Sequence, residues 1–151
     1  MIALLQRVSQ AKVEIDGVKV GSCGHGLMIL LGVINGDDEN DALLLAEKIS
    51  KLRIFSDDDG KMNLSVNDIG GSALVISQFT LGANYKKGNR PDYLNSAPPA
   101  ISEPLYEKFI SLLDERIGGS VEHGQFGADM QVTLTNDGPV TIIMDSAVLK
   151  K

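Results

Sequence analysis

Residues 73–81, with the sequence Ala-Leu-Val-Ile-Ser-Gln-Phe-Thr-Leu, form the stretch on which the interpretation of this chain depends. We expect one short strand here, because the stretch begins with apolar and β-branched residues and glycines lie on both sides of it. Ser77, Gln78 and Thr80 then place two hydroxyls and an amide at the end of the strand. Buried polar side chains must form hydrogen bonds or face a cleft, so these residues either satisfy a strand end or belong to a site.

Residues 136–141, Asn-Asp-Gly-Pro-Val-Thr, are the second informative stretch. Apolar and polar residues alternate before it and after it, and alternation with a period of two predicts β-strands. The Gly138-Pro139 pair predicts a turn between these strands. The three segments together therefore predict a terminal antiparallel hairpin, in which the turn by itself carries no function.

The remaining pattern predicts further strands and two helices. Alternation around the Asp16-Gly17 pair is typical of a hairpin, and the apolar run 27–33 predicts a central strand covered on both faces. The acidic run 37–41 precedes a helical pattern and favours a capped helix start over a ligand cluster. We expect Ser102 to cap the second helix. The apolar faces of the two helices are predicted at Leu45, Ile49 and Leu52, and at Leu105, Phe109, Leu112 and Leu113.

Composition is that of a globular protein, with 43% hydrophobic and 23% charged residues. The pattern predicts one compact α+β domain over residues 1–151, with mixed, largely antiparallel β-sheets and two main helices. No apolar run approaches the roughly 20 residues that a membrane helix needs. Charged residues interrupt the opening segment before a secretory signal forms, so we expect a cytoplasmic protein without membrane contact.

Charge and cysteine content exclude several functions. The net charge of −6 argues against a broadly basic surface for nonspecific binding of nucleic acid, and we expect no DNA partner. Cys23 is the only cysteine, which excludes an intrachain disulfide and a multi-cysteine metal site. His25 and His123 lie far apart and have no metal-binding spacing. Ser77 lacks the Gly-x-Ser-x-Gly context of a serine hydrolase, and neither Ser77 nor Thr80 has an adjacent base.

The segment after the polar strand end concentrates positive charge in an otherwise acidic chain. Lys86, Lys87 and Arg90 lie between Tyr85 and Tyr93 in a loop rich in glycine and turn-forming residues. Such a loop is either a solvated loop or a surface whose cations meet phosphates and whose tyrosines stack on bases. Its position directly after residues 77–81 favours contact with a substrate.

The two informative stretches together resemble the paired motifs of the D-aminoacyl-tRNA deacylases. These motifs are Ser-Gln-Phe-Thr-Leu at residues 77–81 and Asn-x-Gly-Pro-x-Thr at residues 136–141. The similarity covers essentially the whole chain and includes Gln-Arg-Val at residues 6–8 and Phe-Gly-Ala-Asp-Met at residues 126–130. Departures are confined to the basic loop at residues 84–90, which leaves the preference among tRNAs open.

This resemblance implies a homodimer with its active site at the subunit interface. It implies hydrolysis of D-aminoacyl-tRNA, and of glycine mischarged on tRNA(Ala), without metal or organic cofactor. The catalytic positions that it assigns are Ser77, Gln78 and Thr80, where main-chain groups hold the aminoacyl-adenosine end. A ribose 2′-hydroxyl of the tRNA would assist hydrolysis, so that Thr80 positions the substrate and direct attack by Thr80 is the less favoured role.

The resemblance also assigns the residues that bind and select the substrate. Gly138 and Pro139 would be joined by a cis peptide bond, and their carbonyls would enter the partner's pocket and reject L-amino acids by collision. Arg7 would hold these carbonyls, and Arg7 with the intact Ser-Gln-Phe-Thr-Leu motif favours the D-specific branch over a related animal subfamily that removes L-alanine. The remaining positions are Phe79, Phe126 and Met130 for the substrate, and Lys86, Lys87 and Arg90 for tRNA.

Two other functions fit the same residues. The chain is then either a generic esterase with Thr80, or Ser77, as its nucleophile, or a noncatalytic tRNA-binding module. Covalent trapping of a hydroxyl by an electrophilic analogue distinguishes the first. Binding of charged tRNA without faster ester loss distinguishes the second.

Overall fold

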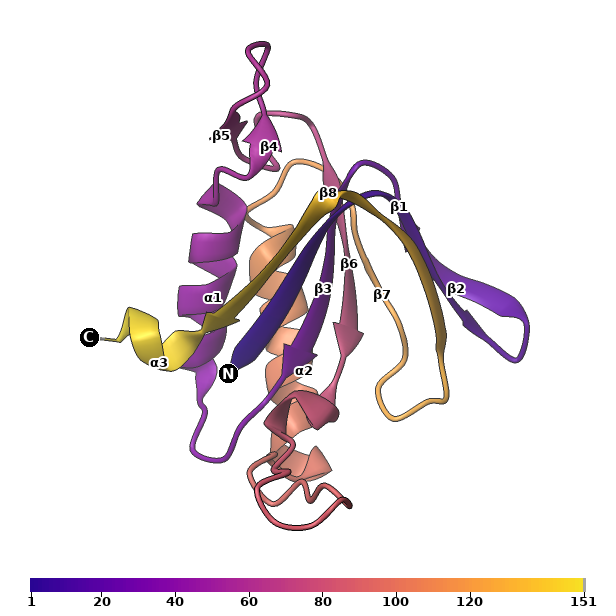
Figure 1. The fold of residues 1–151 in the computed structure, drawn as a ribbon, viewed down its shortest axis with the longest axis vertical. Helices are drawn as coiled ribbons and strands as arrows, with labels where there is room; N and C mark the ends of the chain where they lie inside the picture. Colours follow the sequence, from indigo (N-terminus) through magenta and orange to yellow (C-terminus); the bar gives the residue numbers. More distant parts are fainter. Residues whose placement is uncertain (151) are drawn as a thin grey trace.

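The computed structural model describes residues 1–150 and contains one sheet of six strands beside a small two-stranded sheet (Figure 1). The large sheet has the order β2-β1-β3-β6-β7, and β8 pairs with β1. Its strands are β1 (Ile2–Ile15), β2 (Val18–Cys23), β3 (Gly26–Gly32), β6 (Ser72–Ser77), β7 (Val121–His123) and β8 (Gln131–Asp145). The small sheet pairs β4 (Phe55–Ser56) with β5 (Met62–Leu64), and the helices are α1 (Glu39–Lys51), α2 (Pro99–Asp114) and α3 (Ser146–Leu149).

The 14-residue strand β1 organises the large sheet. On one edge its first half pairs with β3 and its second half with β2, and on the other edge it pairs with β8. These pairings are antiparallel, whereas β6 runs parallel to both β3 and β7. The predicted α+β class with a mixed, largely antiparallel sheet is therefore confirmed.

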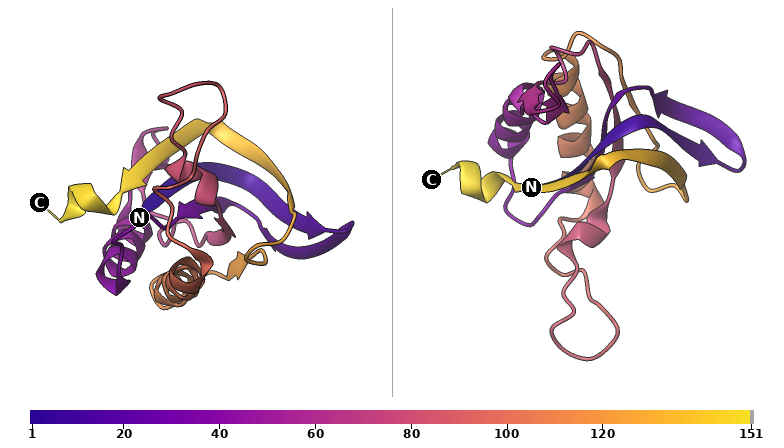
Figure 2. Two further views of the ribbon diagram at one scale, coloured as in Figure 1. Left: turned by 90° about the horizontal axis from the view of Figure 1, so that it is seen from below. Right: turned by 45° about the horizontal axis from the view of Figure 1, so that its top comes forward.

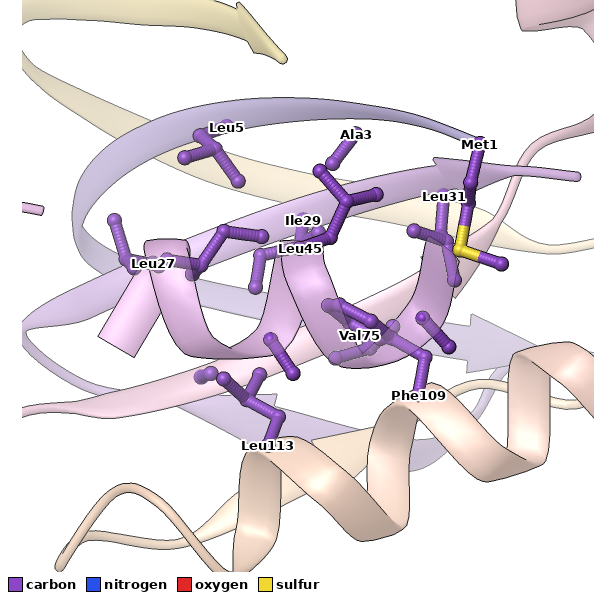
Figure 3. Packing of buried hydrophobic residues seen from close by; sticks show 14 of the residues in the cluster. Met1, Ala3, Leu5, Leu27, Ile29, Leu31, Leu45, Val75, Phe109 and Leu113 are labelled. Atoms are coloured by element: carbon purple, nitrogen blue, oxygen red, sulfur yellow. The ribbon is translucent and has the colours of Figure 1, made fainter. Parts of the chain in front are cut away.

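The main hydrophobic core lies between the sheet and helices α1 and α2, which cover the same face of it (Figures 1 and 2). Alternate residues of β1, such as Ala3 and Leu5, point to this side and pack near Leu45 and Phe109 from the two helices (Figure 3). A second, smaller cluster is formed by residues of β1, β2, β3 and β6: Val8, Ala11, Val13, Cys23, Met28, Leu74 and Ile76. No helix within residues 1–150 is both long and apolar enough to cross a membrane.

The helix starts follow different rules at the two main helices. Asp38 caps α1, and Asp38 and Asp41 form a reciprocal capping box, as the acidic run predicts. The predicted cap of α2 at Ser102 is wrong, because the helix begins at Pro99 and its N-cap residue is Pro98. Proline is favoured in the first helical turn, where its missing N–H costs nothing. Ser102 lies inside the helix, and its hydroxyl donates to the Pro98 carbonyl at 3.1 Å.

The structure corrects the extent of the strand that was predicted for residues 73–81. Strand β6 ends at Ser77, and Phe79–Gly82 form a short 3-10 turn, η1. The amide of Gln78 donates to the Leu31 carbonyl at 2.8 Å, which is the last bond of the β3–β6 ladder, and β3 itself ends at Gly32. The chain then turns into η1. The polar motif therefore lies across the ends of two parallel strands.

The predicted terminal hairpin is also wrong. Residues 131–145 form the single strand β8, which runs in one direction along β1. Gln6 pairs with Thr141 and Val8 pairs with Asn136, so the four β8 residues 137–140 lie opposite Arg7 alone. The alternating pattern resembles a hairpin, but β1 is long enough to pair with both segments. The Gly138-Pro139 pair lies in a bulge between them.

A buried carboxylate joins the start of α1 to the C-terminal helix α3. Asp41 accepts hydrogen bonds from the Ser146 hydroxyl at 2.6 Å and from the Asp38 amide at 2.8 Å. The Lys150 ammonium lies 2.8 Å from the same carboxylate. Burial alone would raise the pKa of Asp41, but the hydrogen bonds from Lys150, Ser146 and Asp38 outweigh it and hold the pKa well below its ordinary value.

Replacing this carboxylate is expected to destabilise the fold in a pH-dependent way. Asp41→Asn should lower the free energy of unfolding by about 1–3 kcal/mol at neutral pH. A neutral amide has one acceptor oxygen and no charge, so it cannot replace the carboxylate toward the Ser146 hydroxyl, the Asp38 amide and the Lys150 ammonium. A lowered pKa in the folded state means that the contribution is complete above the ordinary pKa of 3.8 and is lost as the pH falls below it. Urea unfolding between about pH 2 and pH 7 measures this difference.

The control is Asp58→Asn, which changes an exposed carboxylate in the turn between β4 and β5. We expect its unfolding free energy to follow that of the unmodified chain at every pH. A deficit of Asp41→Asn that stays constant down to about pH 2 would contradict the role of its charge.

Candidate active site

A pocket of about 630 Å³ opens at the C-terminal end of β6. Ser77 is the last residue of this strand and pairs with Leu31 of β3, so both strands contribute to the floor. Residues of η1, of the start of α2 and of the segment before β8 complete the walls. The lining residues named by the sequence analysis are Ser77, Gln78, Phe79, Tyr93, Ser102, Phe126 and Met130.

The polar groups of the pocket rim are mainly amides and hydroxyls. Thr80 is not among the residues that line the pocket, although Gln78 beside it is. The Gln78 side-chain amide donates to the Thr80 hydroxyl at 2.5 Å, and within residues 1–150 the Thr80 side chain forms this one hydrogen bond. In the same described region, the backbone amides of Phe79 and Thr80 have no acceptor, because they precede the first bonded amide of η1. Two main-chain donors are thus available at the end of the polar motif.

Two walls of the pocket are apolar. The Phe126 and Tyr106 rings lie 5.9 Å apart, and both line the pocket with Met130. The Tyr106 hydroxyl donates to the Val75 carbonyl at 3.0 Å, and burial raises the pKa of this phenol. Tyr106 therefore fixes α2 against β6 as an uncharged group.

Several lining residues were not identified from the sequence. Tyr106 has the spacing of the apolar face of α2, so its position resembles that of an ordinary core residue. Ser96 lies in an irregular segment, and only the tertiary structure brings its hydroxyl to the Phe79 carbonyl at 2.7 Å. Asp129 is the one charged residue among those that line the pocket, and it is exposed. Asp129 belongs to the 126–130 motif, but the resemblance assigned roles there to Phe126 and Met130 and not to Asp129.

Arg7 and the Gly138-Pro139 bulge lie at the other end of the sheet. Ser77 pairs with Leu31 of β3, and Leu31 pairs with Ala3 of β1, so Ser77 and Ala3 lie at the same height in the sheet. Arg7 is four residues further along β1. Four residues of a strand span about 13 Å. Within one chain, the structure therefore does not bring Gly138 and Pro139 to the pocket that contains Ser77, Phe126 and Met130.

The bulge itself is held by the buried Arg7 side chain. The guanidinium donates to the carbonyl of Asp137 at 2.9 Å and to that of Ile54 at 2.8 Å. The carbonyl that Arg7 holds is thus the one before Gly138, and not one of the Gly138-Pro139 pair as expected. The Gly138-Pro139 peptide bond is cis, and both residues are exposed. Gly138 has a φ of 140°, which favours glycine.

The basic loop projects beyond the body of the molecule at the end where η1 lies (Figure 2). Asn84 and Asp92 form an antiparallel bridge at its base, with backbone hydrogen bonds of 2.8 and 2.9 Å. Lys86, Lys87 and Arg90 are exposed, and none of them forms an ion pair within residues 1–150. Their charges are free to meet an anion.

The two histidines lie away from the pocket lining. His25 is 5.5 Å from the Phe55 ring, and its Nε2 atom is 3.9 Å from the Asp137 carboxylate. His123 ends β7 and contacts the neighbouring Gly124 carbonyl at 2.6 Å. In the part of the chain that the structure describes, no three His, Cys, Asp or Glu residues are grouped so that they would hold a metal ion.

Comparisons with known proteins place this chain in the class of ester hydrolases that act on aminoacyl-tRNA. A D-aminoacyl-tRNA deacylase of Roseiflexus castenholzii is 56% identical over 151 residues, which are all of this chain and 96% of the relative. One of Proteus mirabilis is also 56% identical, over 93% of this chain and 97% of the relative. The family model described as D-Tyr-tRNA(Tyr) deacylase matches residues 4–145. The chain belongs to this D-aminoacyl-tRNA deacylase family, as its motifs predict.

Solved structures agree with the assignment of the fold. A c-Myc DNA unwinding element binding protein superimposes with a TM-score of 0.91 at 37% identity, over 96% of this chain and 98% of the other. A probable eukaryotic D-amino acid tRNA deacylase superimposes with a TM-score of 0.81 at 17% identity, over 95% and 98%. At that identity the second likeness concerns the fold alone.

The fork of the Arg7 side chain makes a testable contribution to stability. Arg7→Lys should lower the free energy of unfolding by about 1–3 kcal/mol, because one ammonium cannot serve both the Asp137 and the Ile54 carbonyl in this geometry. Thermal or urea unfolding measures the change. Arg90→Lys, in the exposed loop, is the matched control and should leave stability unchanged. Equal stability of both variants would show that Arg7 does not hold the bulge.

Proposed function

We propose that this chain hydrolyses the ester of D-aminoacyl-tRNA, and of glycine mischarged on tRNA(Ala), and spares L-aminoacyl-tRNA. Water adds to the acyl carbon, the bond from that carbon to the ribose oxygen breaks, and free tRNA and the amino acid leave. The observation that carries this proposal is the pocket at the end of β6, which Ser77, Gln78 and Phe79 line, together with the available amides of Phe79 and of the adjacent Thr80. Family membership supplies the substrate class.

Main-chain donors are the groups that we expect to stabilise the reaction. Donors aimed at a developing oxyanion contribute about 2.7–4 kcal/mol each. Ser77, Gln78 and Thr80 position the ester, and the Gln78 amide already fixes the Thr80 hydroxyl. A threonine nucleophile needs an adjacent base, and the hydrogen bond of Thr80 comes from an amide donor instead. We therefore assign activation of the water to the neighbouring 2′-hydroxyl of the substrate, with no cofactor.

The selection of D over L substrates is proposed to come from a second copy of the chain. Gly138 lies on β8, three strands away from β6 in the order β8-β1-β3-β6, which is about 14 Å across the sheet. It is also about 13 Å away along the strands. The exposed bulge can thus meet a pocket only in another protomer, where its carbonyls would collide with an L side chain. A D side chain points elsewhere, and glycine has none, so both are admitted.

An apolar strip on the outer face of β1 and β8 supports a homodimer. Ile143 is 70% exposed and pairs across the strands with Leu4, which is itself only half-buried. Ile143 lies on β8, which pairs with β1 alone, and an exposed apolar pair of this kind beside a sheet edge fits a surface that a partner covers. The strip lies between the bulge and the C-terminal end of β8, which is where a partner has to approach.

The proposal is tested with D-tyrosyl-tRNA, L-tyrosyl-tRNA and glycyl-tRNA under identical conditions. The D and glycyl esters should be lost rapidly and the L ester should be spared, with a chelator present. A matched D ester whose terminal ribose lacks the 2′-hydroxyl should be stable. Loss of ester is followed by acid precipitation of labelled aminoacyl-tRNA, with an enzyme-free control. Equal loss of all three esters, or loss of none, would overturn the proposal.

Two variants separate the proposed chemistry from side-chain catalysis in the same assay. Asp129→Asn removes the one carboxylate among the residues that line the pocket and should leave kcat nearly unchanged. Thr80→Ala should slow the reaction by about tenfold, the scale of one lost hydrogen bond. A loss of several orders of magnitude in either variant would assign the role of base or nucleophile to that side chain.

The proposed dimer gives a separate prediction. Ile143→Glu should produce a monomer, because it places charge in the middle of the apolar strip, and deacylation should be lost with the dimer. Sedimentation velocity measures the oligomeric state. Met62→Glu is the control, because Met62 is also exposed but lies in the small β4-β5 sheet. A dimer that persists in Ile143→Glu would show that the strip is not the interface.

A further inference from the structure

The mouth of the pocket contains an aromatic pair that the proposed chemistry does not use. The Phe79 and Tyr93 rings lie 5.0 Å apart and meet edge to face at 72°. Both residues line the pocket, yet Phe79 is 58% exposed and Tyr93 is 37% exposed. An edge-to-face pair leaves at least one ring face open for stacking. The chain thus presents an aromatic surface to solvent at the entrance of its own pocket.

Backbone contacts hold this pair in place. The Ser96 hydroxyl donates to the Phe79 carbonyl at 2.7 Å, and the Ser96 amide donates to the Tyr93 carbonyl at 3.0 Å. The next residue, Ala97, donates its amide to the Val33 carbonyl at 3.0 Å and so joins this segment to the end of β3. The two rings therefore belong to a preformed surface, and a ligand would not have to order a free loop to use it.

The cations near the aromatic pair indicate which kind of ligand it would bind. Lys86, Lys87 and Arg90 lie in the loop that leads to Tyr93, and they carry the unpaired charges described above. Aromatic rings beside unpaired cations bind a strand in which planar bases alternate with phosphates. The acidic character of the whole chain, with a net charge of −6, makes this local combination distinctive.

We infer that Tyr93, supported by Phe79, forms a stacking site for the base of the nucleotide that immediately precedes the esterified terminal nucleoside. This inference rests on the proposed function, which places the terminal nucleoside inside the pocket. The preceding base then reaches the mouth, where Tyr93 lies, and its phosphates point to the basic loop. Tyr93 thereby reads the single-stranded character of the RNA end without reading its sequence, because every base has a face that can stack.

The test compares two D-tyrosyl esters that differ only in the upstream nucleotides. One is the ester of adenosine alone, and the other is the ester of the trinucleotide C-C-A. Tyr93→Ala should raise KM for the trinucleotide ester by about 5- to 100-fold, which is the range for one base stacked on one aromatic ring. The variant should leave kcat for that ester, and all constants for the adenosine ester, unchanged. Tyr93→Phe should behave as the unmodified enzyme does.

Leu94→Ala is the matched control, because Leu94 follows Tyr93 and is 81% exposed but does not line the pocket. It should not raise KM for either ester. An equal rise for both esters in Tyr93→Ala would overturn the inference, since Tyr93 would then act on the terminal nucleoside or on the shape of the pocket. An unchanged KM for the trinucleotide ester would overturn it as well.

The inference and the proposed function fail in distinguishable ways. If the unmodified protein cleaves neither ester and also leaves D-tyrosyl-tRNA intact, the proposed function fails, and calorimetric titration with uncharged C-C-A and with adenosine then tests the stacking site alone. Tighter binding of C-C-A that Tyr93→Ala removes would support the site without catalysis. Equal binding of the trinucleotide by both proteins would overturn it.

Discussion

Pairing on both edges of β1 is the constraint on which the rest of the structure depends. One edge is occupied by β3 and then by β2, and the other by β8 along nearly its full length. Because both ladders are fixed, the extra residues of β8 opposite Arg7 cannot be absorbed by a shift of register, which would move every side chain of β8 to the other face. Residues 137–139 therefore bulge out and are exposed, whereas Val140 returns to the core. The buried Arg7 guanidinium lies behind the bulge and donates to the Asp137 and Ile54 carbonyls.

The pocket depends on a second property of the same sheet, the parallel pairing of β3 and β6. Parallel neighbours end at the same edge: the bond from the Gln78 amide to the Leu31 carbonyl is the last of this ladder, and β3 ends at Gly32. Strand β6 thus has to turn into η1 over the end of β3, which leaves the first amides of η1 without partners. Donors of this origin are part of the backbone, so they are positioned as accurately as the strands themselves.

Most of the fold could be predicted from the sequence, and the errors have physical causes. The hairpin around Asp16-Gly17, the buried strand β3 and both main helices are local patterns that the structure confirms. The β8 hairpin was mispredicted because alternation reveals strands but not whether a partner is long enough to pair with both of them. Strand β6 was predicted too long because its length is set by the end of its partner β3 at Gly32, and β3 lies far from β6 in sequence.

Residues of the candidate site could be predicted only where a side chain or a family motif marks them. Ser77, Gln78, Phe79, Phe126 and Met130 line one pocket, whereas Thr80 of the same motif does not, and their roles in binding or catalysis stay a prediction. The available amides of Phe79 and Thr80, and the contact from Ser96, have no sequence signature, because a backbone donor carries no residue identity. The sequence analysis also missed Tyr106 as a lining residue, because its spacing in α2 is that of an ordinary core residue.

The separation of the bulge from the pocket explains why the proposed enzyme would be a dimer and not a monomer with a longer loop. Both features are fixed by the same sheet, so a movement that brought them together within one chain would have to break the β1 ladders. In the proposed dimer a two-fold axis would avoid that cost, because it would bring each bulge to the partner's pocket and create two identical sites at once. The proposed wall that discriminates between enantiomers would then be as rigid as the interface, and stereoselectivity would depend on assembly.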